Sequence, residues 1–191
     1  MRVYLAGPDV FLPDPHRRGA VLKAICARHG LTGVFPMDQL DAEPAEWAAL
    51  AEPQRIALRN EAHIRGADAL IANLTPFRGP SADVGTVFEL GFMRALNRPV
   101  FGWSTGHADF STRTREFLGD RAAPAEDGVW RDHEGLALES FGCLDNLMID
   151  GAVVASGGVL EIFEIAGAAR WLDLAPFERC VARAAEVLRG G

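Results

Sequence analysis

The stretch "ALIANLTPFRGPSADVGTVFELGFMRAL", residues 69–96, contains a strand, a loop and a helix in immediate succession. Five of its first six residues are apolar, which is typical of a parallel strand buried on both faces. A loop rich in glycine and proline follows, and a mainly apolar helix begins after Asp83. A strand that runs through a loop into a helix predicts an α/β unit.

The rest of the chain repeats this alternation. Further strands are expected at residues 3–6, 33–35, 99–103 and 152–155. Further helices are expected at residues 16–29, 43–52, 53–66, 158–170 and 176–189. Residues 104–141 are less regular and predict an excursion over the surface. We therefore expect one α/β domain over residues 1–191, with a doubly wound, flavodoxin-like or Rossmann-like parallel sheet of about five strands flanked by helices.

The composition limits the classes of partner and compartment. A net charge of −7 argues against a nucleic-acid partner, because nucleic-acid binders display a basic face. The three cysteines form no CxxC pair, which favours free thiols in a reducing compartment. The N-terminal apolar run is too short for a signal peptide, and no stretch approaches the roughly 18 apolar residues of a membrane span. These features predict a cytoplasmic protein without a membrane partner.

Several common site motifs are absent from the sequence. No GxxxxGK[ST] or GxGxxG motif is present, and Asp83 before the helix would repel a phosphate. The five histidines show no HExxH or paired spacing. A GxSxG motif is also missing, so serine hydrolysis has no support. The sequence therefore implies neither a metal nor a cofactor.

Two carboxylates in the opening stretch require a partner or a cleft. Asp83 is placed to cap the following helix, and a substrate contact is the alternative for the same residue. Glu89 lies beyond the reach of capping, among apolar neighbours, where an isolated charge would be costly. It either faces a ligand site or forms an ion pair with Arg94 or Arg65. In open α/β sheets ligands bind beyond the carboxyl ends of the strands, which is where residues 7–11 and 75–83 are expected.

Four segments of the chain resemble the nucleoside 2-deoxyribosyltransferase family. They are "YLAGP" (4–8), "ADALIANLTPFRG" (67–79), "SADVGTVFELGFMRAL" (81–96) and "NLMI" (146–149), in the order and roughly the spacing of that family. The combination of a D-x-G-x-x-F-E-x-G block with a later N-L-M is specific. Residues 104–141 and those beyond 155 are not well covered by the resemblance.

The resemblance implies a nucleophile and two residues that assist it. Glu89 would attack C1′ of a 2′-deoxynucleoside and form a covalent deoxyribosyl-enzyme, from which a second base regenerates a nucleoside with retention at C1′. Tyr4 would orient this glutamate, and Asp83 would contact the 5′-hydroxyl of the sugar. A carboxylate accepts from a hydroxyl but repels a phosphate, so Asp83 favours nucleosides over 5′-monophosphates. The expected partners are thus 2′-deoxynucleosides and free nucleobases.

The resemblance also implies further substrate contacts. Asn146 and Met148 are similar to residues that reach into a neighbouring subunit's site, which predicts self-association. Asn60 stands where many family members have an aspartate that handles the proton on the leaving base, and an amide cannot deliver that proton. Either another group such as Asp38 supplies the proton, or bound water does, or the exchange rate is low. The remaining expected base or loop contacts are Gly7, Phe11, Phe77 and Arg78.

Two other functions stay open from the sequence. A hydrolase would use the same Glu89 chemistry with water as the acceptor. A non-catalytic nucleoside-sensing module would bind the ligand without turnover, and binding would survive Glu89→Gln. Base preference and the size of the oligomer depend on contacts that the sequence does not place.

Overall fold

The computed structural model describes residues 1–107 and 109–190 and has an α/β architecture. Its central sheet has five parallel strands in the order β2-β1-β3-β4-β7, which is the flavodoxin-like order. The strands are β1 (Arg2–Ala6), β2 (Thr32–Val34), β3 (Ala69–Asn73), β4 (Val100–Ser104) and β7 (Leu160–Ile162). The expected fold class, with about five parallel strands, is confirmed.

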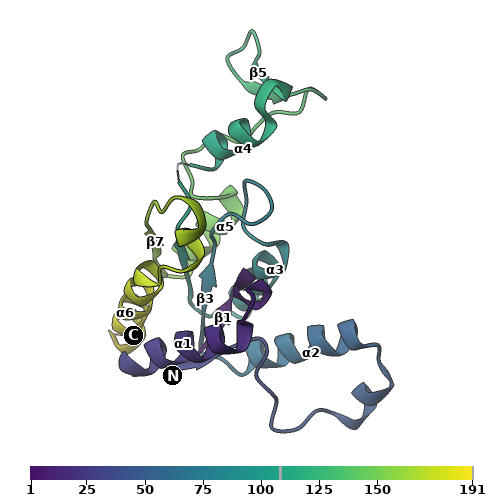
Figure 1. Ribbon diagram of the computed structural model, residues 1–191, viewed down its shortest axis with the longest axis vertical. Coiled ribbons are helices and arrows are strands. Elements are labelled where there is room, and N and C mark those ends of the chain that lie inside the picture. Colours follow the sequence, from purple (N-terminus) through teal and green to yellow (C-terminus); the bar gives the residue numbers. More distant parts are fainter. Residues whose placement is uncertain (108, 191) are drawn as a thin grey trace.

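Helices cover both faces of this sheet (Figure 1). They are α1 (Pro15–Arg28), α2 (Glu52–Arg65), α3 (Val84–Ala95), α5 (Leu147–Ala155) and α6 (Ala175–Gly190). Val3 and Leu5 of β1 pack into one apolar core with α1 and α6, while Tyr4 and Ala6 pack into a second core with α2, α3 and α5. Because side chains alternate along a strand, Tyr4 is directed to the face that α3 covers.

The strand order reverses at β1: β2 lies on one side of it, and β3 with the later strands lies on the other. Loops that leave β1 and β3 therefore diverge at their carboxyl ends and leave a crevice there. The loop after β1 contains the short 3-10 helix η1 (Pro8–Phe11), and the loop after β3 leads into α3. This crevice is the place that the sequence predicted for a ligand.

Two predicted elements near the C-terminus are wrong. Residues 152–155, expected as a strand, form the last turn of α5, because Asn146 caps the helix and Ile149 and Val153 bury one helical face. Residues 158–170, expected as a helix, contain β7 and most of the 3-10 helix η4 (Gly167–Trp171). The middle of the expected helix at 43–52 is the 3-10 helix η2 (Ala45–Ala49).

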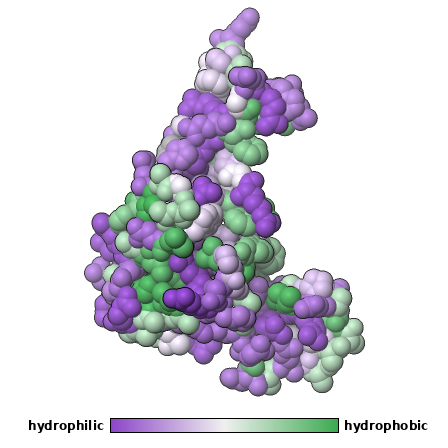
Figure 2. Space-filling view, viewed as in Figure 1, coloured by the Kyte–Doolittle hydropathy of each residue, from purple (hydrophilic) through white to green (hydrophobic). Residues whose placement is uncertain are grey.

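Two parts of the chain extend away from the sheet (Figure 1). The upper one, which we call the arm, contains α4 (Phe110–Leu118), the 3-10 helix η3 (Gly119–Arg121) and an antiparallel pair formed by β5 (Ala122–Pro124) and β6 (Trp130–Asp132). The other is formed by η2 and the first turns of α2. In the view of Figure 2 the outer arm is mostly hydrophilic, while hydrophobic residues gather over the body. The predicted excursion at 104–141 is thus more regular than expected.

Within the described residues, none of the helices has the length and apolar character needed to cross a membrane.

Candidate active site

Glu89 lies on α3 and is held by two donors from other elements. The Tyr4 hydroxyl of β1 donates to Glu89 Oε1 at 2.7 Å, and Asn60 Nδ2 of α2 lies 3.4 Å from the same oxygen. Tyr4 is fully buried, and Glu89 is partly buried. In the part of the chain that the structure describes, Glu89 forms no ion pair with Arg65 or Arg94, since Arg65 contacts Glu61 and the Phe92 ring instead. Of the two alternatives for Glu89, the geometry favours the ligand site.

Burial makes the Glu89 carboxyl a weak acid. Loss of water raises the pKa of Glu89 from 4.5 to about 7, and the nearby Asp83 charge contributes in the same direction. The hydrogen bond from Tyr4 opposes this rise, because it stabilises the carboxylate. Burial and the Glu89 charge together raise the pKa of Tyr4 well above its usual value. Tyr4 therefore stays protonated and serves as a permanent donor.

Asp83 is the N-cap of α3 and also lines the cavity in front of Glu89. Its Oδ2 accepts from the Thr86 backbone N–H at 3.0 Å and from Thr86 Oγ1 at 3.2 Å. The capping interpretation is therefore correct. Both bonds fall on one oxygen, so capping and contact with a ligand are compatible in the same residue.

A cavity of about 370 Å³ brings five of the predicted residues together, namely Gly7, Phe11, Asn60, Asp83 and Glu89. It is lined by Gly7, Val10, Phe11, Pro36, Met37, Ile56, Asn60, Asp83, Gly85, Thr86 and Glu89. Two carboxylates, one amide and the Thr86 side chain thus face a wall that is otherwise apolar. Such a wall with few polar groups suits a small organic molecule. Pro36, Met37 and Ile56 were missed, because nothing in the sequence distinguishes them from ordinary core residues.

Gly7 is required by the close approach of two neighbouring segments. A Cβ on Gly7 would lie 2.7 Å from Asn73 Cβ and 2.8 Å from Asp9 Oδ2. Asp9 is itself buried and accepts from Asn73 Nδ2 at 2.8 Å and from Arg18 Nε at 2.7 Å. This network ties the loop after β1 to the end of β3. The absence of a side chain at Gly7 keeps the loop in place and the cavity open.

Phe11 forms the side of the cavity next to an aromatic cluster. Its ring stacks on Phe77, with 5.3 Å between centroids and 12° between planes. The Arg78 guanidinium lies 4.6 Å from the Phe77 centroid and 5.3 Å from that of Phe11. Arg78 has a φ of 56°, which is uncommon for a residue other than glycine. Phe77 and Arg78 line a neighbouring pocket rather than the Glu89 cavity, and they support Phe11 from behind.

The family model of the nucleoside 2-deoxyribosyltransferases matches residues 3–148. The chain belongs to the nucleoside 2-deoxyribosyltransferase family. Its members form a class of enzymes that transfer a glycosyl group.

Individual relatives agree with this family. The solved structure of a 2-desoxiribosyltransferase from Leishmania mexicana is similar over 91% of this chain and 95% of its own, with 28% identity and a TM-score of 0.58. An uncharacterized protein from Schizosaccharomyces pombe is 35% identical over 170 residues, which cover 84% of this chain and 80% of the relative. A conserved protein from Enterococcus faecalis V583 shares the fold, with 20% identity, a TM-score of 0.51, and coverage of 96% of this chain and 98% of its own.

Asp38 is not part of the cavity wall in this deoxyribosyltransferase-family chain. Its carboxylate accepts from Lys23 Nζ at 2.5 Å and from the Phe35 backbone N–H at 2.9 Å. These bonds fix the turn after β2, and the preceding Met37 reaches the cavity instead. The geometry therefore gives Asp38 a part in shaping the turn.

Asn146 and Met148 lie at the start of α5, outside the Glu89 cavity. The Asn146 side chain accepts from the Met148 backbone N–H at 3.0 Å and donates to Glu139 at 2.7 Å. Met148 is 71% exposed. Their predicted contact with a neighbouring subunit stays a prediction.

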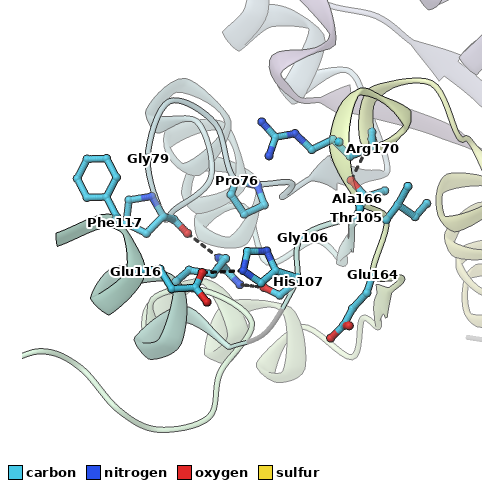
Figure 3. Close-up of a pocket in the computed structure, with 14 residues that line it drawn as sticks. Pro76, Gly79, Thr105, Gly106, His107, Glu116, Phe117, Glu164, Ala166 and Arg170 are labelled. Carbon is cyan, nitrogen blue, oxygen red and sulfur yellow. Dashed lines mark hydrogen bonds and ion pairs between the residues drawn. The ribbon is translucent and has the colours of Figure 1, made fainter. Parts of the chain in front are cut away.

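A larger cavity of about 600 Å³ lies at the base of the arm (Figure 3). Figure 3 shows His107 and Glu116 paired on one side and Arg170 on the opposite side. Its charged groups have both signs and are partly paired, and none of the residues predicted from the sequence lines it. Among residues 1–107 and 109–190, no cluster of three or more His, Cys, Asp or Glu is arranged to hold a metal ion.

Proposed function

We propose that this protein exchanges the nucleobase of 2′-deoxyribonucleosides through a covalent intermediate on Glu89. The observation that carries the proposal is the position of Glu89, which Tyr4 holds at 2.7 Å beside a mainly apolar cavity. Both donors contact Oε1, so Oε2 is the oxygen that is left to attack C1′. A fixed and partly dehydrated carboxylate has little reorganisation to complete before it attacks.

The reaction proceeds in two displacements at C1′. Oε2 of Glu89 forms a bond to C1′ while the C1′–N bond breaks, and the electron pair and one proton go to the leaving base. A second base then attacks C1′ from the other face, the bond to Glu89 breaks, and the incoming base loses a proton. Two inversions give retention. With a pKa of about 7, Glu89 is largely ionised at pH 8, as a nucleophile requires.

Asp83 and the apolar wall provide the means to bind the sugar and the base. Asp83 would accept from the 5′-hydroxyl through the oxygen that does not cap α3, and its charge disfavours a 5′-phosphate. Phe11 would contact the flat face of the base, with Phe77 and Arg78 supporting the Phe11 ring. Asn60 would hold Glu89 through Nδ2. It has no proton to give to the base.

The leaving base takes its proton from water in this scheme. Among the described residues that line the cavity, only Asp83 and Glu89 are titratable. Glu89 must be ionised to attack, and both oxygens of Asp83 have a role already, one in capping α3 and the other as the proposed acceptor from the 5′-hydroxyl. Bound water is the donor that remains. Bases that leave readily without strong acid assistance should therefore react fastest.

Self-association would complete the site. The exposure of Met148 and the position of Asn146 at the start of α5 are compatible with contact to a neighbouring copy. Phe88 and Val84 of α3 are also exposed apolar residues, at 62% and 83%. Apolar groups of this kind favour burial in an interface. We include this association in the proposal.

A chromatographic assay tests the proposed function. The protein is incubated with 2′-deoxyinosine and adenine or cytosine, beside a reaction without acceptor. Glu89→Gln is the test variant, and Glu186→Gln is the matched control, because Glu186 is an exposed glutamate on α6. A new deoxynucleoside that forms with wild type and Glu186→Gln but not with Glu89→Gln supports the transferase. Free hypoxanthine released at the same rate with or without acceptor would show a hydrolase instead.

A further inference from the structure

Arg113 and Asp145 form a buried charged pair where the arm meets the body. Their exposed fractions are 4% and 0%, and Arg113 Nη2 lies 3.9 Å from Asp145 Oδ2. Arg113 also donates to the backbone carbonyls of Pro80 at 2.9 Å and Leu144 at 2.5 Å. Buried charges are tolerated only where hydrogen bonds satisfy them, so this pair fixes the segments that supply those bonds.

The Asp145 carboxylate joins two loops that are far apart in the sequence. Its Oδ2 accepts from the Ala82 backbone N–H at 2.8 Å, and its Oδ1 accepts from Ser81 Oγ at 2.5 Å. Oδ1 also accepts from the Asn146 backbone N–H at 2.8 Å. Ser81 and Ala82 directly precede Asp83, and Asn146 begins α5. One carboxylate therefore holds the N-terminal ends of both α3 and α5.

The α5 side of this network is closed by Asp150. Its carboxylate accepts from the backbone N–H groups of Leu144 at 2.8 Å and Asp145 at 3.0 Å. Asp145 is thus held from its own backbone as well as from Arg113. A side chain fixed in this way can set the position of its partners rather than follow them.

We propose that Asp145 is a positioning residue that fixes the positions of Asp83 and Asn146 relative to each other. The inference rests on the proposed function, in which Asp83 contacts the 5′-hydroxyl in its own cavity and Asn146 serves a neighbouring copy. Through Ser81 and Ala82, Asp145 sets where the Asp83 carboxylate stands in front of Glu89. Through the Asn146 amide, it sets where α5 presents its first residues. A shift of one loop is transmitted to the other.

Preference for the 5′-hydroxyl is the readout that separates positioning from general stability. The ratio of kcat/KM for a 2′-deoxynucleoside to that for the matching 2′,5′-dideoxynucleoside is measured in wild type, Asp145→Asn, Asp83→Ala and the double variant. Asp127→Asn is the matched control, because Asp127 is exposed on the arm. Wild type and Asp127→Asn should prefer the hydroxyl by about tenfold or more. Asp145→Asn should reduce the ratio by about tenfold, and Asp83→Ala should add little to Asp145→Asn.

Hydrogen exchange tests the same inference without a substrate. In Asp145→Asn, the backbone amides of 81–83 and 144–147 should both exchange about tenfold faster or more, while those of α1 are unchanged. Ser81→Ala removes a single bond to Asp145, so it should loosen 81–83 alone and reduce the substrate ratio part of the way. This milder variant provides the test if Asp145→Asn does not fold.

The two measurements separate failure of the inference from failure of the proposed function. If wild type converts no deoxynucleoside, the proposed function is wrong, and exchange alone decides the role of Asp145. Loosening of only one of the two segments in Asp145→Asn would overturn the inference. Equal loss of activity on both substrates, with an unchanged ratio, would also overturn it.

Discussion

Replacing Glu89 by glutamine should stabilise the protein at pH 8 but not at pH 5. Because burial raises the pKa of Glu89 from 4.5 to about 7, the folded protein keeps a proton between these values that the unfolded chain has lost. The stability of the wild type therefore falls as the pH rises from about 4.5 to about 7, and then stays at the lower level. Glutamine is neutral throughout, and its Oε1 can still accept from Tyr4.

The size of the effect follows from the two pKa values. Each pH unit between them corresponds to about 1.4 kcal/mol, so the range from 4.5 to about 7 gives roughly 3 kcal/mol. The carboxylate is only partly buried, and solvent screening reduces this value. We expect wild type to lose about 2 kcal/mol more than Glu89→Gln between pH 5 and pH 8.

Urea unfolding at pH 5 and pH 8 measures this difference. Wild type, Glu89→Gln and the exposed control Glu186→Gln are compared at one protein concentration, because self-association would add to the apparent stability. Glu186→Gln should follow wild type at both pH values. A difference between wild type and Glu89→Gln that does not change with pH would refute the assigned burial of the charge. A wild type that is more stable than Glu89→Gln at pH 8 would refute it as well.

Three other substitutions test the surroundings of Glu89. Tyr4→Phe removes the donor that lowers the pKa of Glu89, so the rising limb of kcat/KM against pH should shift to higher pH by about one unit. A limb that stays at the same pH would contradict the role of the Tyr4 hydroxyl. Asp83→Ser keeps a capping residue but removes a charge that raises the pKa of Glu89, so the rising limb of kcat/KM should move to lower pH. The KM for a 5′-monophosphate should also fall. An unchanged ratio of monophosphate to nucleoside activity would count against the 5′-hydroxyl contact. Gly7→Ala should lower stability by about 1–3 kcal/mol in thermal unfolding because of the contacts with Asn73 and Asp9, and Gly79→Ala, which has open space around its Cβ, should not.

The sheet and the position of the site could be predicted from the sequence because their patterns are local. The apolar run of β3, the loop after it and the capped helix α3 all follow from neighbouring residues. The residues "AVVA" of α5 misled the prediction, since their β-branched side chains favour strands while the cap at Asn146 starts a helix. The strand β7 has three residues and no clear alternation, so its pairing with β4 depends on tertiary contacts.

The candidate site also has a part that the sequence predicts and a part that depends on tertiary contacts. Glu89 stood out as a carboxylate on an apolar helix, which is a property of the sequence alone. The contacts of Tyr4 and Asn60 with one of its oxygens depend on how β1, α2 and α3 pack, and no spacing reveals them. Asp38 was expected near the base, but the proximity of Lys23 on α1 engages its carboxylate. The part played by Asp145 depends on contacts between residues more than 60 positions apart.

Mass spectrometry can detect the covalent intermediate on Glu89 itself. The protein is mixed with a 2′-deoxynucleoside without acceptor, quenched with acid, digested and analysed. If Glu89 is the nucleophile, the peptide that contains it gains the mass of one 2-deoxyribosyl group, and this increase disappears when an acceptor base is added before the quench. Turnover without any adduct on that peptide, or an adduct that survives in Glu89→Gln, would contradict this role of Glu89.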